Sequence, residues 1–207
     1  MKIIIAGAYA IGTHLARLLS RDHDDIVVMD NDEERLSRIG SDVDILTMEA
    51  SSTSVKALKK AGAESADLFI AVTPDESQNM ASCVLAKALG TRKTVAKIDN
   101  SEYIGPDLKE FFAGLGVSSI IYPEMLAATD INNGLKMSWV RQRWDVHGGA
   151  LVMLGVKLRE SCTILDRPMR DICGPEDPYH IVAIKRQGET IIPGGNDCLQ
   201  MYDMAYF

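Results

Sequence analysis

The sequence predicts an α/β protein: a doubly wound, Rossmann-like parallel sheet followed by a small α+β domain. The chain opens with an apolar run, Ile3 to Ala6, a glycine turn at Gly7 and a helical pattern from Ile11. Short apolar runs then alternate with helical segments as far as residue 142. After residue 143 the pattern changes to hairpins. Strands separated by helices imply right-handed crossovers, and therefore a parallel sheet.

Six strands are expected in the first domain, residues 1–142. Each is a short apolar run bounded by charged or turn-forming residues, at 3–6, 26–29, 45–48, 68–72, 94–98 and 119–122. Nearly continuous apolar strands fit a sheet that is covered on both faces. The intervening segments read as helices, at about 55–61, 76–89 and 107–115 among others, and Pro123 opens a longer one predicted to reach about Val140.

The second domain, residues 143–207, is expected to be small. Residues 144–154 read as two strand pieces around a Gly-Gly turn, and residues 181–193 read as a hairpin. Residues 203–207 look like a strand that begins as the chain ends. That ending leaves open whether this domain is truncated.

Composition excludes several classes of protein. The chain has 207 residues with 46% hydrophobic residues, enough for a proper core, and a net charge of −7 that argues against a nucleic-acid partner. No apolar run reaches the ~18–20 residues of a membrane span, so direct membrane insertion is not expected. The four cysteines form no C-x-x-C pair, which argues against zinc and indicates reduced thiols in a cytoplasmic protein.

The first corner of the sheet is a candidate phosphate site. A strand, a glycine turn and a helix leave backbone N–H groups and the positive end of a helix dipole facing one point. The expected Gly-x-Gly-x-x-Gly pattern is broken, because Tyr9 stands where the middle glycine belongs. Tyrosine still presents its N–H if its backbone needs no positive φ. The candidate residues of this corner are Gly7, Ala8, Tyr9, Ala10, Ile11 and Gly12.

Further candidates lie where later strands end. Asp30 ends the second strand, where a dinucleotide-binding fold places the carboxylate that accepts hydrogen bonds from a ribose diol. A carboxylate at this position favours NAD or an adenine nucleotide over NADP. Asp30 also suits the alternative role of a helix cap. Glu49 ends the third strand, within reach of an adenine amino group. Thr73 and Asn79 flank the mouth of the fourth strand as ligand contacts or as a helix cap, and Lys97 ends the fifth, where it could reach a phosphate.

Catalytic patterns are missing from the sequence. It contains no Tyr-x-x-x-Lys pair, no Gly-x-Ser-x-Gly turn and no His-Glu-x-x-His helix. A binding protein is therefore favoured over an enzyme. Two alternatives stay open: an NAD-dependent oxidoreductase on the same fold, and a degenerate module that binds nothing and only oligomerises.

Several segments together resemble the regulator of potassium conductance (RCK), or KTN/TrkA-type, family of cytoplasmic gating subunits. The similar segments are residues 4–12, 27–32, 48–52, 71–79, 96–98 and 122–124, with 182–193 and 202–207 resembling the family's small C-terminal domain. The resemblance adds Asn31, Ala50 and Pro74 to the candidate site. Departures from the family pattern also fall at this site: Tyr9 and Met48 replace glycine, Glu49 replaces aspartate and Lys97 replaces arginine.

The resemblance implies a regulatory subunit of a potassium-uptake system that binds NAD(H), or alternatively ATP or ADP. The helix from Pro123 would cross to a partner subunit, and a ring of copies would dock on a Trk-type potassium transporter in the membrane. Trk regulators usually carry two such units in tandem, so this chain is expected to correspond to one of them or to a fragment.

Overall fold

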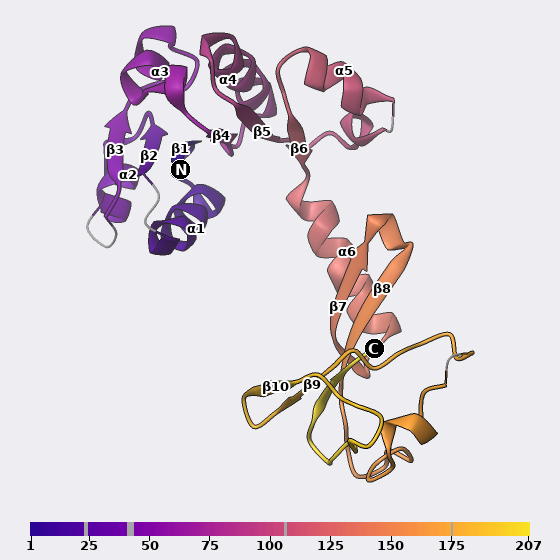
Figure 1. The fold of residues 1–207 in the computed structure, drawn as a ribbon. Helices are drawn as coiled ribbons and strands as arrows, with labels where there is room; N and C mark the ends of the chain where they lie inside the picture. The colour runs from indigo at the N-terminus through magenta and orange to yellow at the C-terminus, as the bar shows by residue number, and fades with distance from the viewer. Residues whose placement is uncertain (23–24, 41–43, 106, 175) are drawn as a thin grey trace. The chain divides into compact units, whose positions relative to one another are not determined.

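The computed structural model describes residues 1–22, 25–40, 44–105, 107–174 and 176–207. It divides the chain into two compact units, residues 1–127 and 128–207, and the division falls within helix α6. Both units are drawn in Figure 1. No helix among these residues combines the length and the apolar character needed to cross a bilayer.

The first unit alternates strands and helices, as the sequence predicts. Its strands are β1 (Lys2–Ala6), β2 (Asp25–Asp30), β3 (Leu46–Glu49), β4 (Leu68–Ala71), β5 (Lys93–Lys97) and β6 (Ser119–Ile121). Its α-helices are α1 (Ala10–Leu19), α2 (Glu33–Gly40), α3 (Val55–Ala61), α4 (Glu76–Leu89), α5 (Leu108–Gly114) and the start of α6 (Pro123–Lys136). Short 3-10 turns occur at Ser20–Asp22, Ala63–Ser65 and Ser101–Ile104.

The six strands form one parallel sheet in the order β3-β2-β1-β4-β5-β6. The chain starts in the middle, builds outward to β3, and then crosses back to place β4 on the other side of β1. The strand order therefore reverses between β1 and β4. In open parallel sheets, ligands bind in the crevice at the carboxyl ends of the strands at this reversal point.

Alternating side chains of β1 reach two separate cores. Ile3 and Ile5 pack on one face of the sheet with residues of α1 and α2, such as Ala16 and Leu36. Ile4 and Ala6 pack on the other face with residues of α3, α4 and α5. Burial on both faces explains why the strands read as continuous apolar runs and confirms the predicted doubly wound sheet.

Helix ends in the first unit follow local chemistry. The Ser54 side chain caps α3 by accepting a hydrogen bond from the N–H of Ala57, and α3 ends at Gly62, which has φ 84°. The Asp75 side chain caps α4 by accepting from the N–H groups of Ser77 and Gln78. Helix α4 spans residues 76–89, as predicted.

Helix α6 ends earlier than the sequence suggested. The prediction extended it to about Val140, but it ends at Lys136, and Val140 begins strand β7. The stretch after Lys136 contains Trp139 and the β-branched Val140, which favour a strand when a partner is available. Val156 of the next strand supplies that partner.

The second unit contains the predicted hairpins in one antiparallel sheet. Its strands are β7 (Val140–Val146), β8 (Leu151–Lys157), β9 (Ala183–Arg186), β10 (Glu189–Ile191) and β11 (Met204–Tyr206), in the order β10-β9-β11-β8-β7. Short 3-10 turns occur at His147–Gly149 and Met169–Asp171. A separate apolar core includes Leu158, Ile184 and Leu199.

One ion pair secures the middle of the second unit. The Arg186 guanidinium donates to both carboxylate oxygens of Asp203, at 2.9 and 2.7 Å, and the N–H of Gln200 donates to the same carboxylate. Asp203 is only 2% exposed. Burial by itself raises the pKa of Asp203, but the hydrogen bonds from Arg186 and Gln200 outweigh it and hold that pKa below its ordinary value.

Replacing Asp203 by asparagine is expected to lower the free energy of unfolding of the second unit by about 2 kcal/mol. This is less than the ~3–5 kcal/mol typical of fully buried pairs, because Arg186 is partly exposed. Since the pKa of Asp203 is lowered in the folded state, its contribution is present above the unfolded-state pKa and is lost as pH falls through the folded value. Urea denaturation at pH 7 and at acid pH measures both effects.

The control for this substitution is Glu34→Gln, which removes one carboxylate from an exposed pair with Arg38. It should leave stability nearly unchanged. An Asp203→Asn variant as stable as the wild type at pH 7 would show that the Arg186–Asp203 ion pair does not stabilise the second unit.

Candidate functional site

Two glycines shape the corner between β1 and α1. Gly7 has φ 107°, and a Cβ on it would lie 2.9 Å from the backbone nitrogen of Thr73. A Cβ on Gly12 would lie 1.8 Å from the carbonyl oxygen of Gly7. Any larger residue would therefore push α1 away from the turn, or the turn away from the end of β4. Close backbone contacts thus explain why glycine occupies both Gly7 and Gly12.

Tyr9 fits the corner without strain. Its backbone, at φ −82° and ψ −173°, is an extended conformation open to any residue, and its carbonyl oxygen accepts the first hydrogen bond of α1 from Thr13. Its side chain is 39% exposed, with the guanidinium carbon of Arg35 lying 4.3 Å from the ring centroid. A glycine here would offer no ring for this cation–π contact.

The Asp30 carboxylate is held by four donors. Its Oδ2 accepts from the N–H of Ala8 at 2.7 Å. Its Oδ1 accepts from the N–H of Asp32 at 3.0 Å and from Nε and Nη2 of Arg35 at 3.2 and 2.8 Å. Burial raises the pKa of Asp30, but the hydrogen bonds from Arg35, Ala8 and Asp32 prevail and lower it, so the group is ionised at neutral pH.

Sequence reasoning missed Arg35, which contacts both Tyr9 and Asp30. It lies in the first turns of α2, five residues after Asp30. Its Nη1 also pairs with Oδ2 of Asp32 at 2.8 Å. The sequence places this arginine five residues after the carboxylate, but that spacing alone does not show that the two side chains meet. Because Arg35 offsets the charge of Asp30, this carboxylate repels the 2′-phosphate of NADP less strongly than an unpaired one would.

Asn79 lies beneath the mouth of β4 rather than in a hollow. It is fully buried, and its Oδ1 accepts from the N–H and the hydroxyl of Thr73 at 2.9 and 2.7 Å. Its Nδ2 donates to the carbonyl oxygens of Thr73 and Lys97 at 2.9 and 3.0 Å. Asn79 thus fixes the end of β4 against the end of β5 and positions Thr73.

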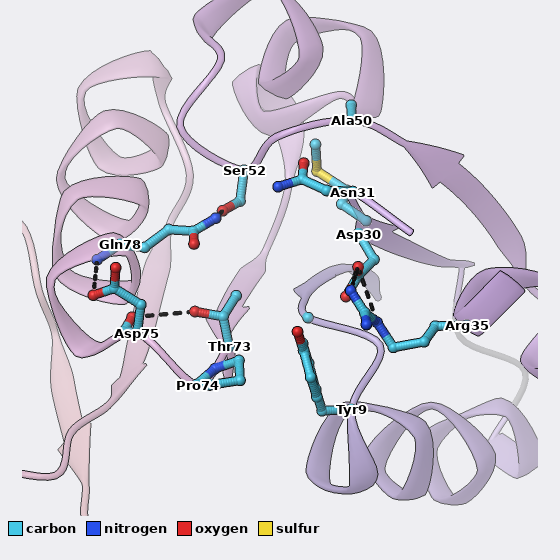
Figure 2. Close-up of a pocket in the computed structure, with 12 residues that line it drawn as sticks. Tyr9, Asp30, Asn31, Arg35, Ala50, Ser52, Thr73, Pro74, Asp75 and Gln78 are labelled. Atoms are coloured by element: carbon cyan, nitrogen blue, oxygen red, sulfur yellow. Dashed lines mark hydrogen bonds and ion pairs between the residues drawn. The ribbon is translucent and has the colours of Figure 1, made fainter. Parts of the chain in front are cut away.

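These elements enclose a pocket of about 190 Å³ at the point where the strand order reverses. Figure 2 shows Tyr9, Asp30 and Arg35 on one side of it and Thr73 and the following turn on the other. Seven predicted residues line the pocket: Gly7, Tyr9, Asp30, Asn31, Ala50, Thr73 and Pro74. Five lining residues were not predicted: Met29, Arg35, Ser52, Asp75 and Gln78.

The other predicted residues are absent from the lining. They are Ala8, Ala10, Ile11, Gly12, Glu49, Asn79 and Lys97. Ala8, Gly12 and Asn79 support the lining through the backbone contacts described above. Lys97 is buried and ion-paired with Asp99, while Glu49 is exposed at the end of the edge strand β3.

The remaining reactive groups offer little chemistry. Across the parts of the chain that the structure describes, no three His, Cys, Asp or Glu side chains gather as a metal site. The four cysteines are free. Burial raises the pKa of Cys83 to about 12, so this thiol stays protonated and unreactive at neutral pH.

Residues 3–123 match the family model of the TrkA-N domain. The chain belongs to the TrkA-N family. It is 30% identical over 193 residues to a Trk system potassium uptake protein TrkA homolog of Methanothermobacter thermautotrophicus, covering 93% of this chain and 86% of that protein. It is 29% identical over 204 residues to the TrkA homolog of Archaeoglobus fulgidus, covering 98% of this chain but only 46% of that protein. The chain thus spans about half the length of the Archaeoglobus relative.

Solved structures share the fold at low identity. The GsuK channel bound to NAD aligns with 99% of this chain and 36% of its own, at 13% identity and a TM-score of 0.65. GsuK bound to ADP aligns with 66% of this chain and 34% of its own, at 21% identity and a TM-score of 0.52. These similarities confirm the predicted Rossmann-like architecture.

Replacing Asn79 by alanine is expected to destabilise the first unit by about 2–4 kcal/mol, because it leaves the buried N–H of Thr73 and the carbonyl oxygen of Lys97 without partners. Urea denaturation measures the loss. Ser77→Ala, on the exposed side of the same helix, is the control and should be neutral. Equal stability of the Asn79→Ala variant would show that these hydrogen bonds do not secure the site.

Proposed function

We propose that this chain is a nucleotide-sensing regulatory unit of a potassium-uptake system and not an enzyme. The observation that carries the proposal is the pocket at the reversal point, where the glycine corner faces Thr73 and an ionised, buried Asp30. A carboxylate at the end of β2 suits a ribose hydroxyl, and the start of α1 suits a phosphate. Family membership supplies the link to potassium uptake.

The proposed ligand is NAD(H), with ADP or ATP as the alternative. The adenosine ribose would meet Asp30, the phosphates would meet the turn at Gly7 and Tyr9, and the adenine would lie toward Asn31 and Ala50. GsuK, which shares the fold, has one structure described as bound to NAD and another as bound to ADP, and this supports the ligand class. The lining contains no His, Lys or Cys among the described residues, which supports binding rather than catalysis.

The proposed partner is a Trk-type potassium transporter in the membrane, and the proposed location is the cytoplasmic side. Copies of the chain would pair through α6 and assemble into a ring. A nucleotide can bias the gate of the transporter only if it binds two states of that ring with unequal affinity. Helix α6 supports the pairing, because none of its residues is buried within the chain.

Isothermal titration calorimetry tests the nucleotide site. We expect the wild-type chain to bind NADH or ADP, and Asp30→Asn to weaken binding about tenfold by removing a charged acceptor of the ribose hydroxyls. Circular dichroism checks that the variant is folded. Glu34→Gln removes the same charge from the neighbouring helix outside the pocket and should not alter binding. Unchanged affinity in a folded Asp30→Asn variant would refute the site.

Pairing through α6 is tested by the oligomeric state. Ile131 and Leu135 lie one turn apart and are 64% and 78% exposed. The double substitution Ile131→Asp and Leu135→Asp is expected to convert dimers to monomers, since it would bury charge in an apolar interface. Light scattering after gel filtration measures the mass. Asn132→Asp, on another face of the helix, is the control; a double variant with wild-type mass would exclude this interface.

A further inference from the structure

Asp30 has little capacity left for a ligand. An ionised carboxylate offers about four lone-pair positions. Four donors already approach Asp30: the N–H groups of Ala8 and Asp32, and two nitrogens of Arg35. Three of them converge on Oδ1. The side chain is 4% exposed, so a ribose cannot reach both of its oxygens while this arrangement holds.

Arg35 is the donor that can be displaced. The N–H groups of Ala8 and Asp32 belong to the backbone of the corner and of the turn after β2, so their positions are set by the fold. Arg35 is a side chain, 30% exposed, and it supplies two of the four hydrogen bonds. Its removal would leave one donor on each oxygen and two of the four acceptor positions open, the number that the two hydroxyls of a ribose diol require.

Two contacts would keep a displaced Arg35 close to the site. Its Nη1 pairs with Oδ2 of Asp32, whose side chain is 37% exposed. Its guanidinium carbon lies over the Tyr9 ring. Neither contact uses the Asp30 carboxylate, so the guanidinium can rotate off Asp30 and remain anchored. Tyr9, which replaces the expected glycine, therefore provides a second support for this arginine.

We propose that Arg35 is an internal competitor of the ribose diol for Asp30. This inference rests on the proposed nucleotide-binding function and adds its regulation: a ribonucleotide gains the Asp30 contact only after Arg35 rotates away. Its apparent affinity is lowered by the small fraction of molecules in which Asp30 is free. A nucleotide without the 2′-hydroxyl keeps one hydroxyl, from which Oδ2 can accept a hydrogen bond beside that of the Ala8 N–H, so it does not compete with Arg35 in this way.

The test compares ADP with 2′-deoxy-ADP by calorimetry on the wild-type chain and on Arg35→Met. We expect the variant to bind ADP about tenfold more tightly and 2′-deoxy-ADP with unchanged affinity, so the preference for the ribonucleotide rises about tenfold. Arg38→Met makes the same change one turn later, at an exposed arginine paired with Glu34, and should alter neither affinity.

Arg35→Lys guards against a variant that fails to fold. Lysine keeps the charge but cannot place two forked N–H groups on Asp30, so the preference for ADP should rise in the same direction by a smaller factor. Weaker binding of both nucleotides, or an unchanged preference, in the folded Arg35 variants would overturn the proposal while leaving the nucleotide site intact. Absence of binding in the wild type and in every variant would overturn the proposed function as well.

Discussion

The candidate site depends on backbone contact between two parts of the chain that are distant in sequence. Gly7 meets the nitrogen of Thr73, and Gly12 meets the carbonyl oxygen of Gly7, at distances where a side-chain carbon would clash. These contacts bring the start of α1 and the ends of β1 and β4 together. The pocket exists because these backbones approach so closely, and its lining side chains are arranged around that contact.

Two buried polar side chains, Asn79 and Asp30, stabilise the site in different ways. Asn79 is fully buried and forms hydrogen bonds with backbone groups at the ends of β4 and β5, so it holds these two strand ends in fixed positions. Asp30 similarly accepts hydrogen bonds from the backbone N–H groups of Ala8 and Asp32, but it also accepts them from the side chain of Arg35. One wall of the pocket is therefore rigid, while the other contains a charged side chain that can change partners.

Most of the fold could be predicted because its patterns are local. Six apolar runs, glycine turns and helix caps identified the parallel sheet and nearly all its elements. The end of α6 was misplaced because Val140 pairs with Val156, and a strand partner sixteen residues away leaves no mark on local periodicity. The position of β11 between β8 and β9 likewise depends on distant pairing.

The site could be predicted at its backbone positions and less well at its side chains. Gly7, Asp30 and Thr73 follow from the strand ends, because parallel strands bring those ends to one edge. Asn79 was predicted as a ligand contact or a helix cap, but its hydrogen bonds join the ends of β4 and β5, and no spacing reveals those bonds. Arg35 was missed because its position on α2 carries meaning only once it is seen to reach back to Asp30 and Tyr9.

The central place of β11 has a consequence for the order in which the chain folds. Strands β8 and β9 do not pair with each other; each pairs with β11. During synthesis, the hairpins β7–β8 and β9–β10 can form as they emerge, but they stay separate until residues 204–206 arrive. In the first unit β4 must likewise return to pair with β1, but the last of its six strands is already complete at residue 121. The second unit is therefore expected to be the later part to acquire its structure, because its joining strand follows every strand that it connects.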